Sequence, residues 1–173
     1  MPELEWTESV AEIPSNGLEK KRSATAEECA SIAAALGLVS CEGVAARYRI
    51  TPRAGGRYAL DGSIDADVTQ ECVVTLEPLP AHLTIPLSVE FVPEAGRTDE
   101  SASDLIDPFA TVDVEPIVQG RMEIGRVVVE EVASNLDPYP RRPESAFEWQ
   151  DEKAAEASPF AALAKLKDRK PES

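Results

Sequence analysis

The chain has 173 residues and 43% of them are hydrophobic, which is enough to bury a core and argues against global disorder. Its formal net charge of -15 and its pI of about 4.4 disfavour binding of DNA or RNA by overall charge and suit a basic partner. The sequence contains neither an apolar run of the roughly 20 residues that span a membrane nor the apolar core of a signal peptide, so we expect a cytoplasmic protein with no membrane partner.

We treat residues 1–24 as an N-terminal segment, and the first predicted element is a helix over residues 25–37. Thr25 is a suitable N-cap, and Glu28, three residues later, completes a capping box. Gly37 fits the position just after the last helical residue, where glycine commonly ends helices. The apolar side chains recur at helical spacing and share one face, which we expect to be packed: Cys29, Ile32, Ala33 and Leu36.

Apolar and polar residues alternate strictly through the next part of the chain, which is typical of antiparallel strands with one buried face. The alternation covers residues 44–50 and 58–68, continues through residues 72–76 as one face of a further strand, and returns in residues 83–91. Pro86 has no backbone N–H, so its strand is expected at a sheet edge or bulged at that point. Three or four such strands in succession predict a meander, or a partial β-barrel if the sheet curls.

The remaining elements follow an acidic loop at residues 92–108, which we expect to be solvated. Residues 111–118 predict a short strand. Residues 122–136 predict a second helix, because their apolar residues keep helical spacing despite a β-branched run that weakens helix propensity. Pro138 and Pro140 end that helix.

The sequence thus predicts an α+β fold, in which an antiparallel meander or partial β-barrel packs with two helices and a short helix follows a linker. The expected organisation is an N-terminal segment at 1–24, a single domain at 25–142, a linker at 143–157, and a short amphipathic helix with its tail at 158–173. Phe160 and Leu163 share the apolar face of the last helix. They are therefore candidates to contact either the domain itself or a partner.

Cys72 lies in the run DVTQECVVTLEP, and the chain's single histidine, His82, follows it closely. A Cys and a His can form a nucleophile and its base, and a hairpin would bring the two side chains near each other. The favoured alternative is a Cys72 thiol that points into the core, keeps a high pKa without a basic neighbour and is inert, with His82 in a loop. A zinc site needs three or four ligands, whereas Cys29 and Cys41 lie on other elements. We therefore predict no catalytic, cofactor-binding or metal-ligating residues.

The segment NLDPYPRRP, residues 135–143, is a candidate binding surface. Prolines on both sides of Tyr139 fix the backbone there, and the basic pair Arg141 and Arg142 follows. A rigid corner of this kind could present the three side chains to a partner. The favoured alternative is a structural corner that tucks Tyr139 against the sheet.

The first predicted hairpin carries a group of basic side chains that are candidates for RNA contact: Arg47, Arg49, Arg53 and Arg57. Together they would form a positive patch that binds phosphates. A plainer alternative, which we slightly prefer, is that these arginines neutralise carboxylates across the sheet, at Asp61, Asp65 and Asp67.

The order of three stretches resembles the YceD-like family, the large ribosomal RNA subunit accumulation proteins of bacteria and plastids. These stretches are GSIDADVTQECVVTLEPLPAHLTIPLSVEFVP, DPFATVDVEPIVQGRMEIGRVVVEEVASNLDPYPRRP and the terminal SPFAALAKLK. The resemblance covers roughly residues 5–168 and is greatest for the alphaproteobacterial branch. None of the three stretches is a catalytic signature, so the resemblance rests on their order and spacing.

The resemblance implies a role in accumulation of 23S ribosomal RNA and in assembly of the large ribosomal subunit, with no established enzymatic activity. Many relatives carry a cysteine pair where this chain has Cys72 alone, which argues further against a metal or redox role here. We therefore expect a non-enzymatic factor that binds a basic ribosomal protein or a large-subunit precursor, with possible contact to 23S ribosomal RNA. The alternative is an RNA-acting or small-molecule enzyme that uses Cys72 and His82.

Overall fold

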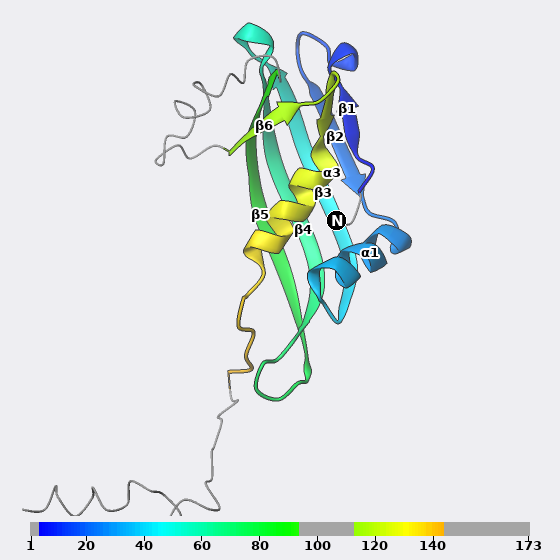
Figure 1. Cartoon of the computed structure of the whole chain (residues 1–173), viewed down its shortest axis with the longest axis vertical. Helices are drawn as coiled ribbons and strands as arrows, with labels where there is room; N and C mark the ends of the chain where they lie inside the picture. The colour runs from blue at the N-terminus through cyan, green and yellow to red at the C-terminus, as the bar shows by residue number, and fades with distance from the viewer. Residues whose placement is uncertain (1–3, 94–112, 144–173) are drawn as a thin grey trace, which may run out of the picture. The chain divides into compact units, whose positions relative to one another are not determined.

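The computed structural model describes residues 4–93 and 113–143, which fold as an open five-stranded sheet with helices, so the α+β prediction is confirmed. The sheet order is β2-β3-β4-β5-β6 (Figure 1). Its strands are β2 (Leu18–Ser23), β3 (Ser40–Pro52), β4 (Tyr58–Glu71), β5 (Pro78–Pro93) and β6 (Asp113–Ile117). The first four strands pair antiparallel in succession, as the predicted meander requires, whereas β6 pairs parallel to β5.

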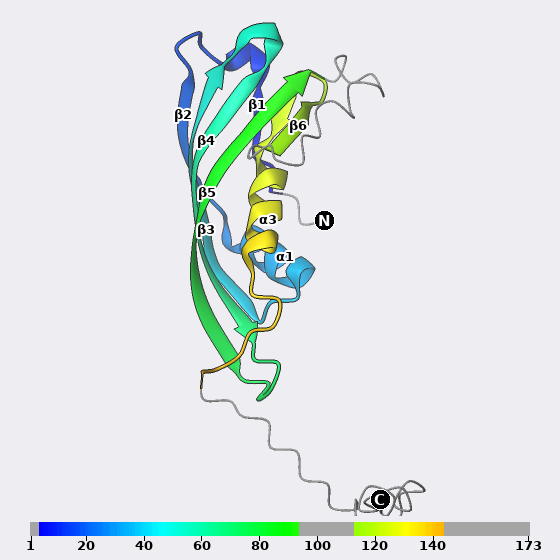
Figure 2. The same cartoon turned by 90° about the vertical axis from the view of Figure 1, so that its left-hand side faces the viewer.

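Two helices and a second, two-stranded sheet cover one face of the large sheet (Figure 2). They are α1 (Ala26–Leu36), α3 (Ile124–Asn135), and the antiparallel pair of β1 (Thr7–Ser9) with β7 (Arg121–Glu123). Short 3-10 turns, η1 (Val10–Glu12) and η2 (Ala54–Gly56), join neighbouring strands. In the part of the chain that the structure describes, neither helix is long and apolar enough to cross a membrane.

The core lies between the covered face of the sheet and these elements, and it follows the alternation seen in the sequence. Alternate residues are buried there through residues 44–50 of β3, 64–68 of β4 and 85–91 of β5, including Tyr48, Ile64 and Phe91. A fully buried large apolar side chain contributes about 1.5–3 kcal/mol, so this alternation supplies much of the stability. At Pro86, β5 pairs with β4 on one side only, because β6 pairs with β5 from Val89 onwards. This agrees with the expected edge position.

The first helix has the predicted ends. The Thr25 hydroxyl accepts a hydrogen bond from the Glu28 backbone N–H at 3.2 Å, and the Glu28 carboxylate accepts one from the Thr25 N–H at 2.7 Å. Gly37 ends the helix with a φ of 66°, a left-handed conformation that favours glycine. Cys29 and Ile32 are buried on the face that packs against the rest of the protein.

The N-terminal segment is part of this fold, although the sequence analysis set residues 1–24 apart. Its described residues form β1 and β2, and β2 completes one edge of the large sheet. Leu4 and Trp6 belong to the hydrophobic core. Four of the six residues of β2 are charged, so the sequence showed no clear apolar alternation that would have predicted its pairing.

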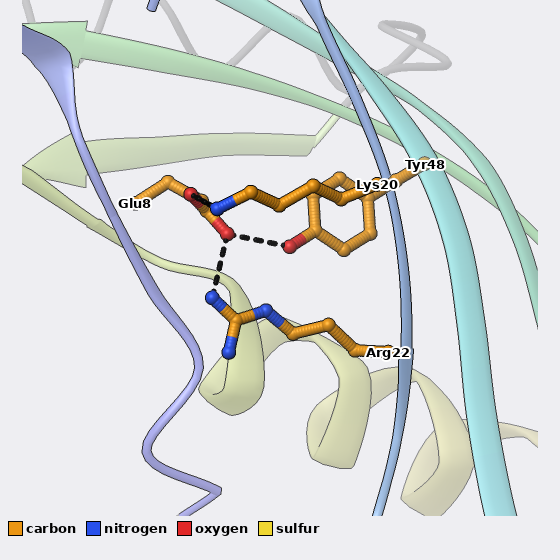
Figure 3. Close-up of polar contacts among 4 residues, drawn as sticks. All are labelled: Glu8, Lys20, Arg22 and Tyr48. Atoms are coloured by element: carbon orange, nitrogen blue, oxygen red, sulfur yellow. Dashed lines mark hydrogen bonds and ion pairs between the residues drawn. The ribbon is translucent and has the colours of Figure 1, made fainter. Parts of the chain in front are cut away.

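Glu8 of β1 anchors that segment through a buried ion-pair network (Figure 3). Its carboxylate is only 2% exposed and accepts hydrogen bonds from Lys20 Nζ at 2.5 Å, Arg22 Nη2 at 2.9 Å and the Tyr48 hydroxyl at 2.8 Å. Burial by itself raises the pKa of Glu8, but the hydrogen bonds from Lys20, Tyr48 and Arg22 outweigh it and hold the pKa below its usual value. The network joins β1, β2 and β3.

Residues 72–76 form a turn and not the predicted strand. Glu71 already pairs with Pro78, so residues 72–77 must reverse the chain between β4 and β5. The turn is closed by the Leu76 N–H, which donates to the Cys72 carbonyl at 2.9 Å, and Leu76 adopts a φ of 58°. His82 consequently lies within β5 and not in a loop.

Two further predicted elements are present in the structure. The predicted strand 111–118 is observed as β6 (Asp113–Ile117), and the predicted helix 122–136 as α3. That helix begins two residues late because β7 uses residues 121–123 to pair with β1. Most of the acidic loop, the linker and the C-terminal helix lie outside the described residues.

Candidate functional site

Two segments far apart in the sequence meet at one end of the sheet. We call them the Cys72 turn, residues 72–77, and the proline corner, residues 135–143. Two contacts join the segments: the Val73 N–H donates to the Pro140 carbonyl at 2.9 Å, and Arg142 Nη1 pairs with Glu77 Oε2 at 2.8 Å. A third contact fixes the corner to β4, where Gln70 Nε2 donates to the Asp137 carbonyl at 2.8 Å. The corner is therefore held in one place after α3 ends.

Tyr139 projects from this corner into solvent and is 71% exposed. Its backbone N–H donates to the Asp137 carboxylate at 2.9 Å, a local turn that the flanking prolines reinforce. Pro140, the next residue, is buried and its carbonyl faces the Cys72 turn. The preferred expectation that Tyr139 tucks against the sheet is wrong, because Pro140 occupies the inward position and directs its neighbour outward.

Exposed apolar side chains gather at the same end of the sheet. The described residues include five large exposed apolar side chains, at Val39, Val73, Leu76, Val114 and Tyr139. Three of them belong to the Cys72 turn and the proline corner. The backbone N–H of Val39 donates a hydrogen bond to the Thr69 carbonyl of β4 at 2.8 Å, three residues before Cys72. Sequence reasoning missed Val73 and Leu76, because it assigned them to a strand.

The two arginines of the corner have different surroundings. Arg142 pairs with Glu77, and its backbone N–H also donates to the Cys72 thiol. Arg141 is exposed and forms no ion pair with any described residue. The other two residues expected to bind a partner, Phe160 and Leu163, lie outside the described residues.

Cys72 is fully buried, as expected, but its thiol is not in an apolar environment. The Thr75 hydroxyl and the backbone N–H groups of Thr75, Arg142 and Val74 donate to the sulfur and lower the pKa of the Cys72 thiol to about 6. This corrects the expected high pKa, which assumed that only a basic side chain could stabilise the thiolate. The sulfur thus helps to join the Cys72 turn to the proline corner.

The structure does not bring Cys72 and His82 together. His82 lies opposite Asp67 in the β4–β5 pairing, with its Nδ1 2.7 Å from Asp67 Oδ1, on the exposed face of the sheet. The pair of Glu71 with Pro78 lies four pairs further along the ladder than the pair of Asp67 with His82. Cys72 follows Glu71 and is buried. At about 3.3 Å per residue, four pairs span about 13 Å of strand, so the backbone positions of Cys72 and His82 lie more than about 13 Å apart. The geometric basis for a Cys–His dyad is therefore absent.

The other two cysteines lie next to each other and away from charged donors. Burial and the neighbouring Cys29 raise the pKa of the Cys41 thiol to about 11, so neither feature favours a thiolate there. Within residues 4–93 and 113–143, no three His, Cys, Asp or Glu side chains are grouped so that they could hold a metal ion.

The arginine hairpin is largely paired with acidic or carbonyl oxygens. Its contacts are Arg47 to Asp65 at 3.7 Å, Arg57 to Glu90 at 3.5 Å, and Arg49 Nη2 to the Asn16 carbonyl at 3.4 Å. Arg53 forms no ion pair with the described residues. Of the three carboxylates expected to be neutralised, only Asp65 contacts one of these arginines among the described residues. Asp67 contacts His82, and Asp61 accepts a hydrogen bond from the Ser88 hydroxyl at 3.3 Å. Exposed ion pairs of this kind are weak.

A family model described as "Large ribosomal RNA subunit accumulation protein YceD" matches residues 60–167. The match covers more than half of the chain and includes both the Cys72 turn and the proline corner. A search of curated proteins and a search of solved structures each gave no match.

Proposed function

Because the chain belongs to the YceD family of large ribosomal RNA subunit accumulation proteins, we propose that it supports 23S ribosomal RNA accumulation and large-subunit assembly without catalysis. It does so by binding a basic ribosomal protein or a large-subunit precursor. This role places the protein in the cytoplasm, with the ribosomes. The observation that carries the proposal is the exposed Tyr139 on a corner fixed to the Cys72 turn.

The geometry of the corner supports binding by a preformed surface. Tyr139 loses little conformational entropy on binding, because its backbone is already fixed by the flanking prolines and by the bond to Asp137. Exposed Tyr side chains are frequent anchors of protein interfaces. The net charge of -15 favours encounter with a basic partner.

Two observations support binding over the alternatives. The separation of Cys72 from His82 leaves the enzymatic hypothesis without its proposed dyad. The ion pairs of Arg47 and Arg57 weaken the case for RNA contact through the arginine hairpin, which stays a prediction.

The proposal is tested by affinity recovery from growing cells, with and without ribonuclease, using the full chain. Tyr139→Ala should reduce recovery of large-subunit components by about tenfold, as expected for an interface anchor. Arg141→Glu should raise recovery, because it replaces a cation of the corner by an anion that attracts a basic partner. Arg142 is left unchanged because it pairs with Glu77 and binds Cys72, so its substitution would alter the corner itself.

The matched control is Arg121→Glu, a charge reversal at an exposed position in β7. It should leave recovery unchanged. Equal recovery by wild type, Tyr139→Ala and Arg141→Glu would remove the corner from the proposal. Recovery of no ribosomal component by the folded wild-type chain would refute the proposed function.

A further inference from the structure

A groove lies beside the proline corner, where both helices end. Its volume is about 360 Å³, within the range of about 300–1,000 Å³ typical of ligand pockets. Leu36 and Leu38 contribute from the end of α1, Ala133 and Leu136 from the end of α3, and Val73 from the Cys72 turn. The groove thus combines apolar and polar lining residues, and one of its apolar residues is the exposed Val73.

The surroundings of this groove are electrically negative. The C-terminal end of a helix carries a partial negative charge, and neither α1 nor α3 has a basic residue in its last turn to offset it. Two acidic residues, Glu71 and Asp137, also line the groove. Glu71 forms no ion pair with the described residues, and Asp137 accepts only the Tyr139 N–H with its side chain.

We propose that this groove binds an apolar protein segment that carries lysine or arginine, with its apolar side chains in the groove and its cations against Glu71, Asp137 and the helix ends. This inference rests on the proposed function and names the chemistry of the partner. Arg142 does not oppose it, because Glu77 neutralises that guanidinium. Arg141 is the remaining cation of the corner and lies outside the groove lining.

The same charges disfavour RNA as the occupant. A phosphate in the groove would face two carboxylates and two negative helix ends, with no described cation among the lining residues. A protein segment with both apolar and basic side chains matches the apolar and the acidic lining residues together.

The test uses the purified full chain and a synthetic helical peptide of leucine and lysine with one apolar face. A scrambled peptide of the same composition controls for attraction by net charge. The groove variant is Ala133→Arg, which places a long cation in the groove from an exposed position. A cation in the last turn of α3 also complements the helix dipole, so this variant should fold.

The matched control is Ser15→Arg, which adds the same charge in the exposed loop before β2. Fluorescence anisotropy should show that Ala133→Arg binds the amphipathic peptide about tenfold more weakly than Ser15→Arg does. Equal affinities of the two variants, or equal binding of the scrambled peptide, would overturn the inference. A wild-type dimer that Ala133→Arg converts to a monomer would also overturn it, because a second copy would then occupy the groove.

Failure of this inference is distinguishable from failure of the proposed function. If Ala133→Arg recovers ribosomal components normally while Tyr139→Ala does not, the groove inference fails and the proposed function stands. If the peptide binds through the groove but wild type recovers no ribosomal component, the groove inference stands and the proposed function fails.

Discussion

At the scale of single residues, Glu8 shows how a buried charge is made favourable in this protein. Its carboxylate is almost completely removed from water but receives three hydrogen bonds, two of them from cations. Lys20 and Arg22 keep about a third of their side-chain surface exposed, at 36% and 31%, so they would reach water if Glu8 were neutral. The cost of neutralising Glu8 is therefore smaller than that of breaking a fully buried ion pair.

We predict that Glu8→Gln lowers the free energy of unfolding by about 2 kcal/mol at pH 7. Because the folded pKa of Glu8 lies below the ordinary value of 4.5, the charged form stabilises the fold fully above that value. The contribution is lost as the pH falls through the lower, folded pKa. The free energy of unfolding should be measured by urea denaturation at pH 7 and below pH 4.5. The difference in this free energy between wild type and Glu8→Gln should be smaller at the acid pH.

The exposed carboxylate of Glu12 in η1 provides the control, since Glu12→Gln should change stability little at either pH. If the free energies of unfolding of wild type and Glu8→Gln differ by the same amount at both pH values, the assigned role of the carboxylate is contradicted.

At the scale of elements, the first turn of α3 holds the N-terminal residues by close backbone contact. The Gly125 N–H donates to the Trp6 carbonyl at 2.9 Å. A Cβ at Gly125 would lie 2.0 Å from the Leu4 carbonyl oxygen and 2.6 Å from the Leu4 Cβ. Only glycine therefore allows α3 and the chain before β1 to approach this closely.

We predict that Gly125→Ala destabilises the protein by about 1–3 kcal/mol, the usual cost of overpacking, and partly releases Trp6 from the core. The emission of Trp6, recorded with Trp149→Phe in the background, should shift to longer wavelength. Gly43→Ala is the matched control, because a Cβ there meets nothing within 4 Å. Unchanged Trp6 emission in a destabilised Gly125→Ala protein would show that the N-terminal residues dock by other contacts.

At the scale of the whole molecule, the proposed function depends on surfaces and not on reacting groups. The large sheet leaves one face without a covering element in the described residues, and His82 lies on that face beside Asp67. Three of the five large exposed apolar side chains of the described residues belong instead to the Cys72 turn and the proline corner, which meet at one end of the sheet. Binding and enzymatic hypotheses therefore predict different sensitive residues.

We predict that cells carrying His82→Ala or Cys72→Ser keep normal 23S ribosomal RNA levels, measured against 16S ribosomal RNA. Serine at position 72 retains a small polar acceptor for the N–H groups of the turn. Tyr139→Ala should lower the 23S level in the same assay. The enzymatic hypothesis would be favoured if the 23S level fell in cells with a folded His82→Ala protein and stayed normal in cells with Tyr139→Ala.

The sequence by itself determined the elements that local chemistry specifies. The capping box of Thr25 and Glu28 and the glycine at position 37 set both ends of α1. Alternation set the buried faces of β3, β4 and much of β5, and helical spacing set α3. The α+β class followed from those patterns. The family resemblance rested on the order of three sequence stretches, and the family match confirms it.

Only the tertiary structure decided the turn at residues 72–77, the parallel pairing of β6, the place of β1 and β2 and the exposure of Tyr139. The short alternation in residues 72–76 is compatible with a strand or with a turn. The pairing of Glu71 with Pro78 places these residues in the turn. The pKa of Cys72 depends on an N–H contributed by Arg142, and the burial of Glu8 depends on Tyr48. These features come from contacts between residues distant in the sequence, whose energies no local pattern contains.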